Sequence, residues 1–214
     1  MEKSASPAGR AYIVIMFIVG WFTLIGQLVL MLGTKAAPAT ELVMRFFTFY
    51  TILTNLLLAV CFTFMLLKPR SKWNDFFTSP AMLAAAATYI TVVSVTYNII
   101  LRFIWSPQGL QRVVDELLHL IIPILYIIFW LIFVPKGGLK WKNVFPLLVY
   151  PLVYLCVILI RGAMSGWYPY PFVDVNQLGY GKALLNSGMI TIAFIIIALL
   201  FVLIDSKKSK RAFD

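Results

Sequence analysis

The sequence predicts an all-α, polytopic membrane protein, a single domain of six transmembrane helices with both termini in the cytoplasm. Hydrophobic residues make up 62% of the 214 and charged residues only 12%, so a soluble domain of this size could not bury its apolar surface. The apolar residues form long continuous runs, which excludes the alternating strands of an outer-membrane barrel. Lys and Arg are also divided unequally between alternate loops, which indicates the orientation in the membrane.

Six apolar runs are long enough to cross a bilayer as helices. The fifth run is the shortest, but Arg161 beside it can extend its charged head to the membrane interface. The first run is longer than the apolar part of a secretory signal, and no convincing cleavage pattern precedes Ala36, so we expect it to be retained. In chain order the expected spans are 11–32, 42–67, 81–105, 117–134, 145–160 and 183–204.

The basic residues follow the positive-inside pattern along the whole chain. With the N-terminus in the cytoplasm, twelve of the eighteen Lys and Arg residues lie inside and six outside. The tail 205–214 contains the run Lys207-Lys208-Ser209-Lys210-Arg211, which we interpret as an orientation signal that contacts anionic lipid. The net charge of +10 therefore predicts contact with membrane lipids and no nucleic-acid partner.

Two cysteines, Cys61 and Cys156, fall within expected spans and show neither a disulfide framework nor metal-ligand spacing. We interpret each as a small packing residue. The sequence indicates no metal and no organic cofactor.

His119 is the only histidine, and it lies near the start of the fourth expected span. An ionisable side chain inside a membrane helix is costly and by default indicates a function. Histidine also has the pKa best suited to proton transfer near neutral pH. The alternative is a structural histidine that is hydrogen-bonded between helices or lies at the headgroup level.

Several polar residues are expected at a similar depth in the outer half of the membrane. Thr48, Thr51 and Asn55 are spaced i, i+3 and i+7, which places them on one face of the second span if that span is one helix. Asn98 near the outer end of the third span and Asn186 at the outer start of the sixth join them. Each of these residues alone is also typical of the hydrogen bonds that join membrane helices, but the whole set beside His119 is typical of a site.

A hydroxyl becomes a nucleophile when a base lies beside it, and histidine is the usual base. Asp115 and Glu116 lie four and three residues before His119, within reach on the helix surface to orient its ring. Acidic residues in the first turn of a helix are also favoured by the helix dipole, which is the alternative interpretation.

The longest expected connection is the fifth loop, 161–182, with an aromatic and proline-rich centre that ends at Asp174. We expect this loop to be ordered and to cover the site, although an interfacial aromatic belt explains the aromatic residues equally well. The run Gly162-Ala163-Met164-Ser165-Gly166 resembles a serine-hydrolase signature. It lies in the outer loop rather than at a helix start, so we interpret it as a coincidental match.

Three stretches resemble the family of the androgen-induced protein and the androgen-dependent TFPI-regulating protein, six-helix membrane proteins with bacterial relatives. They are Phe46-Phe47-Thr48-Phe49, His119 followed by Pro123, and Trp167 before Tyr170-Pro171-Phe172-Val173-Asp174. The resemblance implies a threonine hydrolase of fatty acid esters of hydroxy fatty acids, with Thr48 as nucleophile and His119 as base. The chain departs from the family after Thr48 and by one extra residue after Trp167, which bears on the substrate.

Together these features predict a membrane-embedded lipid ester hydrolase in the plasma membrane of a bacterial cell. Thr48 and His119 are the expected catalytic residues, and a lipid with an acyl chain is the expected substrate. Asn55, Asn98 or a backbone amide is expected to stabilise the oxyanion. A non-enzymatic protein that binds or transports lipid in the same polar pocket is the first alternative, and a structural or regulatory membrane protein is the second. The expected supporting residues are Thr51, Asn55, Asn98, Asp115, Asp174 and Asn186.

The topology is testable by thiol labelling of intact cells, in a background with Cys61 and Cys156 replaced by alanine. A cysteine at Ser4 or Ser209 should resist a membrane-impermeant reagent applied from outside, whereas one at Ser165 should react, because positive loops stay in the cytoplasm. The reverse pattern of labelling would contradict both the orientation and the outer-leaflet position of the site.

Overall fold

The computed structural model describes residues 6–210, and all regular secondary structure in that range is helical. Six helical segments are long and apolar enough to cross a membrane. The prediction of an all-α fold with six spans is therefore confirmed, and the chain is a multi-pass membrane protein. Each predicted run falls on one of these segments, although several of the helix ends differ from the prediction.

The first, second and third spans are α2, α4 and α6, and the fourth is formed by α7, the π-helix η2 and α8 in succession. Helices α9 and α10 form the last two spans, and short helices occupy the connections. The bounds of the spanning elements are α2 Pro7–Gly33, α4 Tyr50–Leu67, α6 Pro80–Ile99, α7 Gly109–Glu116, η2 Leu117–Ile121, α8 Ile122–Phe133, α9 Val144–Ser165 and α10 Val175–Lys210. The connecting elements are α3 Ala39–Phe46, α5 Lys72–Phe77 and the 3₁₀-helices η1 Leu101–Phe103, η3 Trp141–Asn143 and η4 Pro171–Val173.

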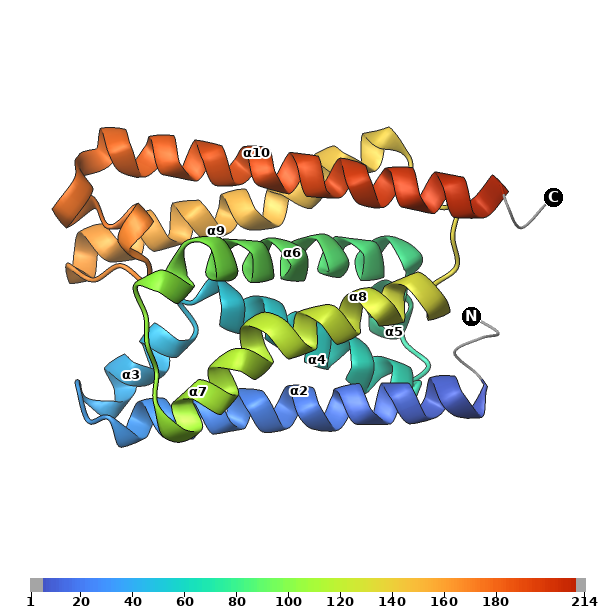
Figure 1. Ribbon diagram of the computed structural model, residues 1–214, viewed down its shortest axis with the longest axis horizontal. Coiled ribbons are helices and arrows are strands. Elements are labelled where there is room, and N and C mark those ends of the chain that lie inside the picture. The colour runs from blue at the N-terminus through green and yellow to red at the C-terminus, as the bar shows by residue number, and fades with distance from the viewer. Residues whose placement is uncertain (1–5, 211–214) are drawn as a thin grey trace.

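The long helices run roughly side by side, so that α2 begins and α10 ends at the same end of the bundle (Figure 1). Helix α5 lies at that end too. The opposite end carries α3, α7 and the connection between α9 and α10. This second end holds the expected site residues, and we call it the site end.

Local sequence signals set the helix starts at the other end of the bundle. The side chains of Ser6 and Ser79 accept hydrogen bonds from the third backbone N–H of α2 and α6, and a proline follows each serine. Serine satisfies one of the free N–H groups at a helix start, and proline lacks the N–H that would otherwise stay unpaired there.

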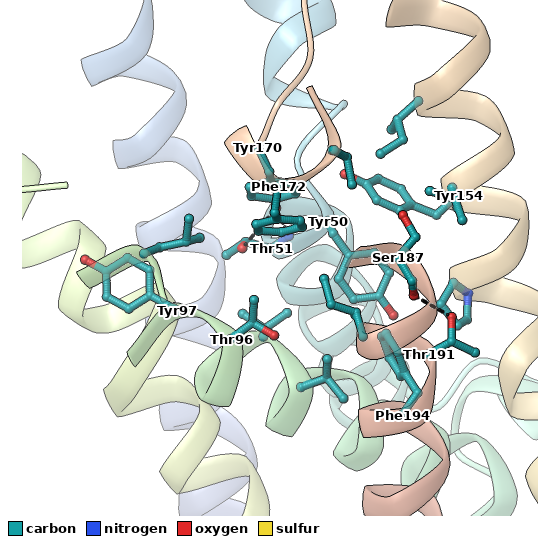
Figure 2. Close-up of a pocket in the computed structure, with 18 residues that line it drawn as sticks. Tyr50, Thr51, Thr96, Tyr97, Tyr154, Tyr170, Phe172, Ser187, Thr191 and Phe194 are labelled. Carbon is teal, nitrogen blue, oxygen red and sulfur yellow. Dashed lines mark hydrogen bonds between the residues drawn. The ribbon is translucent and has the colours of Figure 1, made fainter. Parts of the chain in front are cut away.

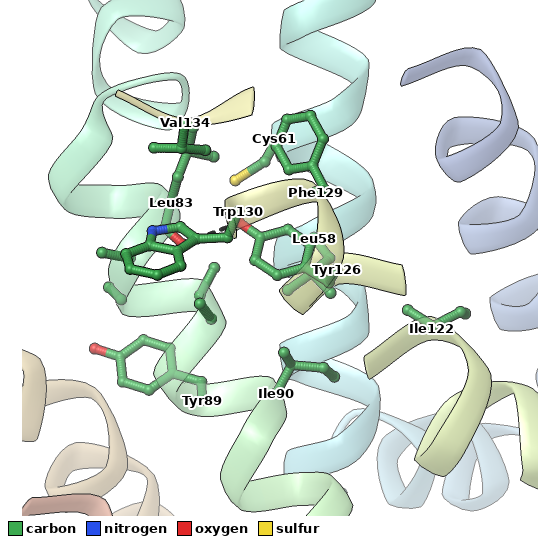
Figure 3. Packing of buried hydrophobic residues seen from close by; sticks show 14 of the residues in the cluster. Leu58, Cys61, Leu83, Tyr89, Ile90, Ile122, Tyr126, Phe129, Trp130 and Val134 are labelled. Atoms are coloured by element: carbon green, nitrogen blue, oxygen red, sulfur yellow. Dashed lines mark hydrogen bonds between the residues drawn. The ribbon is translucent and has the colours of Figure 1, made fainter. Parts of the chain in front are cut away.

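Helices α4, α6 and α8 pack together in the middle of the bundle. Tyr126 and Trp130 of α8 are fully buried (Figure 3). Phe62 of α4 lies edge-on to the Tyr126 ring. The alanine run Ala84–Ala87 of α6 is buried against them. Small side chains let membrane helices approach closely, so the alanines make room for the large rings of α8.

The second predicted span, 42–67, is not one helix. It divides into α3 and α4, with a turn at 47–49 between them. The carbonyl oxygen of Thr48 in this turn accepts a hydrogen bond from the Tyr154 hydroxyl at 2.8 Å instead of from a helical N–H. A contact from α9, 106 residues away in the chain, thus satisfies the break.

The fifth loop and the C-terminal tail also differ from the prediction. Helix α9 continues to Ser165 and α10 begins at Val175, so Arg161 and Lys182 belong to helices and the connection is only 166–174. The first turn of α10 is separated from the rest of the helix by a kink at Gly179, whose φ of 72° is not helical. Helix α10 continues into the expected tail as far as Lys210, and Asp205 is buried there, accepting hydrogen bonds from the backbone N–H groups of Gly137 and Leu139. Residues 211–214 of the tail lie outside the described residues.

Gly162 of α9 allows this connection to pack closely. A Cβ atom at Gly162 would overlap the ring of Tyr168, which is itself buried. We therefore expect Gly162→Ala to lower the free energy of unfolding by about 1–3 kcal/mol, the usual cost of overpacking. Thermal unfolding of the purified protein in detergent measures the change. Gly188→Ala is the matched control, because Gly188 lies in α10 with no atom within 4 Å of the added methyl group. Equal melting temperatures for the two variants would contradict the prediction.

Candidate functional site

The position of His119 depends on a helical irregularity that the sequence itself causes. Pro123 stands four residues after His119 and has no N–H, so the His119 carbonyl loses its normal α-helical partner. The chain forms the π-helix η2 at this point. The Ser94 hydroxyl donates to the free carbonyl at 2.7 Å, and the Asn98 side-chain amide donates to it at 3.3 Å. Helix α6 therefore fixes the backbone that carries the histidine, and π-helical turns of this kind often occur at functional sites.

The hydrogen-bond partners of the His119 ring define its tautomer in the neutral form. Its Nδ1 atom lies 2.9 Å from the backbone carbonyl oxygen of Asp115 and 3.3 Å from the Asp115 carboxylate. Because a carbonyl oxygen can only accept a hydrogen bond, Nδ1 carries the proton in the neutral ring. Nε2 is then the nitrogen that can accept a proton. Asp115 therefore contacts the His119 ring through Nδ1, which is the contact expected from the sequence.

Tyr97 of α6 completes this cluster. Its hydroxyl donates a hydrogen bond to the Asp115 carboxylate, and its ring stacks on the His119 imidazole with centroids 3.8 Å apart and planes 14° from parallel. Sequence reasoning missed Tyr97, because a tyrosine in an apolar span gives no signal of its own. Its position directly before Asn98 was the available hint.

Glu116, the other expected partner of His119, points elsewhere. It forms a bidentate ion pair with Arg102, with both N···O distances 2.7 Å. Arg102 also donates to the Asn98 side-chain oxygen at 2.8 Å. This pair joins η1, which follows α6, to the last residue of α7 and leaves Asp115 as the carboxylate beside the imidazole.

His119, Asp115 and Tyr97 line a cavity of about 430 Å³ that also contains Thr51. This volume is within the range of small-molecule sites in proteins. Apolar side chains form most of its wall, and we call it the His119 cavity. Its remaining lining residues are Gln27, Met31, Phe46, Phe49, Ile52, Leu101, Ile104, Trp105, Gln111, Leu118, Pro169, Tyr170 and Pro171.

The two candidate threonines differ in their relation to this cavity. Thr48 lies in the turn before α4, where its hydroxyl donates to the Met44 carbonyl at 2.7 Å, and it is not among the cavity-lining residues. Thr51 is the second residue of α4 and lines the cavity. The structure therefore brings Thr51, and not Thr48, to the same cavity as His119. The break between α3 and α4 is the reason, because it removes Thr48 from the helical face that the sequence spacing predicted.

A second, smaller cavity of about 80 Å³ lies on the other side of Thr51, among α4, α6, α9 and α10. Thr51 and Tyr170 lie together with Tyr97 to one side and Ser187 and Phe194 to the other (Figure 2). Thr51 and Tyr170 line both cavities. We call this second space the inner cavity, and its lining is mainly aliphatic and aromatic.

The remaining expected residues, Asn55, Asn186 and Asp174, form hydrogen bonds with backbone groups near these cavities. Asn55 donates through its side-chain amide to the carbonyls of Thr51 and Leu118, at 2.9 and 3.4 Å. The Asn186 amide donates to the Phe172 carbonyl at 2.9 Å, and the Asp174 carboxylate accepts from the Asn176 N–H at the start of α10. None of these three residues is among those lining the two cavities.

The connection 166–174 covers the site end of both cavities through Pro169, Tyr170 and Phe172, as expected of the fifth loop. Trp167 attaches this connection to α3 and α9 by cation–π contacts. The guanidinium groups of Arg45 and Arg161 lie 4.8 and 5.3 Å from the centre of its ring. Both arginines also pair with Glu41, at 2.7 and 3.0 Å.

Ser165 is exposed, and its hydroxyl contacts Arg161 and the Trp167 backbone. Within residues 6–210, no group of three or more His, Cys, Asp or Glu side chains is placed to hold a metal ion.

No family model, curated protein or solved structure matches the chain significantly. The site is therefore interpreted from its own geometry.

The ion pairs of Glu41 with Arg45 and Arg161 make the stability of the folded protein depend on pH. The hydrogen bond from Arg45 lowers the pKa of Glu41 most strongly; desolvation opposes this effect, and Arg161 lowers the pKa further. A carboxylate whose pKa is lower in the folded state adds stability above its unfolded pKa, ordinarily about 4.3. That contribution is lost as the pH falls through the lower, folded value.

We therefore expect Glu41→Gln to lower the melting temperature at pH 7, and the difference from the parent protein to shrink as the pH falls below about 4. Thermal unfolding of both proteins across the pH range measures it. A difference that stays constant down to the acid limit would show that charge pairing at Glu41 does not fasten the loop.

Proposed function

We propose that this protein is a membrane-embedded hydrolase of lipid esters, with a threonine nucleophile and His119 as its base. The observation that carries the proposal is the His119 cavity, where an imidazole with a defined tautomer and a threonine hydroxyl line one space. A nucleophile, a base and a group that orients the base are the parts needed for acyl transfer. The resemblance to the six-helix threonine hydrolases supports the same reaction class.

The geometry favours Thr51 as the nucleophile, whereas the resemblance favours Thr48. In the proposed reaction the threonine Oγ attacks the ester carbonyl carbon while Nε2 of His119 removes its proton. The tetrahedral intermediate collapses when the protonated imidazole gives that proton to the departing alkoxide. Water then attacks the acyl-threonine with His119 again as base, which releases the fatty acid and restores the hydroxyl.

The cavities also indicate the kind of substrate. The His119 cavity combines an apolar wall with a few polar groups, including Gln27 and Gln111, which hydrogen-bond to each other at 2.8 Å. The inner cavity, lined by Val92, Ile190 and other apolar side chains, is the space for an acyl chain. A fatty acid ester of a hydroxy fatty acid, or a similar lipid ester, fits this combination.

We place this activity in the outer leaflet of a bacterial plasma membrane. The distribution of Lys and Arg supports an external position for the site end, and the resembling family has bacterial members. The substrate would then enter from the membrane, with no nucleic acid and no cofactor involved.

A fluorophosphonate probe, which labels activated hydroxyl nucleophiles, tests the proposal on the purified protein in nanodiscs. Thr51→Ala should abolish labelling, because no oxygen remains at that position. His119→Ala should slow labelling by about 10²–10⁴-fold, the usual contribution of a general base. The double variant should be no worse than Thr51→Ala, because the two groups act as one unit.

Thr48→Ala is the matched comparison, since it removes a buried threonine hydroxyl three residues away that donates to the Met44 carbonyl of α3. If Thr48→Ala abolishes labelling and Thr51→Ala does not, the nucleophile is Thr48, as the resemblance implies. Tight copurification of lipid without labelling or turnover in the parent protein would instead favour the lipid-binding or transport function.

A further inference from the structure

The proposed hydrolysis places negative charge on the carbonyl oxygen of the substrate, and a donor must stabilise it. The side-chain amides expected for this role are engaged elsewhere. The Asn98 amide donates to the Ser94 and His119 carbonyls, and the Asn55 amide donates to the Thr51 and Leu118 carbonyls. A further side-chain donor lies at the junction of the two cavities, which is formed by residues that line both of them.

Tyr170 occupies that junction. Its hydroxyl oxygen accepts a hydrogen bond from the Thr51 backbone N–H at 3.3 Å and lies 3.5 Å from the Thr51 hydroxyl oxygen. Its side chain lines both the His119 cavity and the inner cavity. The phenol is therefore beside the oxygen that would attack the substrate.

The Tyr170 ring is held in place by other aromatic rings. The Phe172 ring stacks on it (Figure 2), with centroids 5.1 Å apart and planes 6° from parallel. Phe49 meets it edge-on, with ring centroids 5.8 Å apart. A donor that is already oriented costs no reorganisation when charge develops on the substrate.

The hydrogen bond from Thr51 also makes the phenol a better donor. Thr51 is in the first turn of α4, where the backbone N–H groups have no partner within the helix, and Phe49 at the N-cap has no polar side chain to supply one. A hydroxyl that accepts one hydrogen bond is polarised to donate another more strongly. Burial raises the pKa of the Tyr170 phenol, so the hydroxyl keeps the proton that it has to donate.

We infer that Tyr170 is a further catalytic residue whose hydroxyl, held by the Thr51 N–H, donates a hydrogen bond to the oxyanion of the attacked ester. The inference rests on the proposed hydrolase function. In the free protein the phenol oxygen lies 3.5 Å from the Thr51 hydroxyl oxygen, and in the tetrahedral intermediate the phenol donates its hydrogen bond to the substrate oxygen. No bond to Tyr170 forms or breaks, and its proton stays on the phenol.

The test is the steady-state hydrolysis of a p-nitrophenyl ester of a medium-chain fatty acid by the full-length protein in nanodiscs. Tyr170→Phe keeps the stacked ring and removes only the hydroxyl. Its kcat should fall by roughly 10²–10³-fold, as when one oxyanion donor is removed from other hydrolases. KM and the acidic limb of the pH–rate profile should change little, because His119 and the apolar walls are intact. Tyr180→Phe is the matched control, since it makes the same change at an exposed tyrosine of α10.

Melting temperatures identify any variant that fails to fold. In that case a fluorinated tyrosine incorporated at position 170 replaces Tyr170→Phe, because it alters the donor strength of the hydroxyl and leaves the ring in place. A donor role requires kcat to change with the fluorine content, whereas a purely structural role leaves kcat constant and overturns the inference.

The two levels of the proposal fail in different ways. If the parent protein hydrolyses the ester and His119→Ala does not, but Tyr170→Phe keeps its kcat, only the role of Tyr170 is wrong. A higher kcat in Tyr170→Phe also overturns it, because the phenol then obstructs the site. If the parent protein shows no His119-dependent hydrolysis of any lipid ester, the proposed function fails and the role of Tyr170 falls with it.

Discussion

The free carbonyl group of His119 is the constraint on which the site depends. Pro123 cannot donate a hydrogen bond to it, so the Ser94 hydroxyl and the Asn98 amide do so from α6. An unpaired carbonyl inside a membrane costs several kcal/mol, which is why the α6 partners are needed. These contacts position the π-helix and thereby place the His119 ring against Tyr97 and Asp115.

A second irregularity brings a hydroxyl to the same cavity. The break at 47–49 starts a new helix at Tyr50, and the N–H groups of its first turn have no partner within the helix. Tyr154 and Tyr170, both distant in sequence, satisfy the backbone at the break, through the Thr48 carbonyl and the Thr51 N–H. Two interrupted helices thus bring together an imidazole, a hydroxyl and a phenol, in line with the rule that irregular backbone inside a membrane is buried in protein or lines a cavity.

Much of the candidate site was visible in the sequence, but its internal arrangement was not. His119 and its partner Asp115 were predicted because charge in an apolar run is costly and four residues make one helical turn. Thr48 was placed on the face of Thr51 because the rule of helical spacing assumes an unbroken helix. The hydrogen bonds of Asn98 and Asn186 could not be predicted from helical spacing either. Their partners, the His119 carbonyl and the Phe172 carbonyl, lie on other elements.

The sequence by itself determined that the chain is a bundle of six membrane-spanning helices, because long apolar runs can satisfy their backbone in lipid only as helices. It also determined that His119 lies within one of them. Only the tertiary structure decided where the helices break and which side chains meet there. Those outcomes depend on contacts such as Tyr154 with Thr48 and Tyr97 with Asp115, and such contacts form between segments whose distance in space no local pattern encodes.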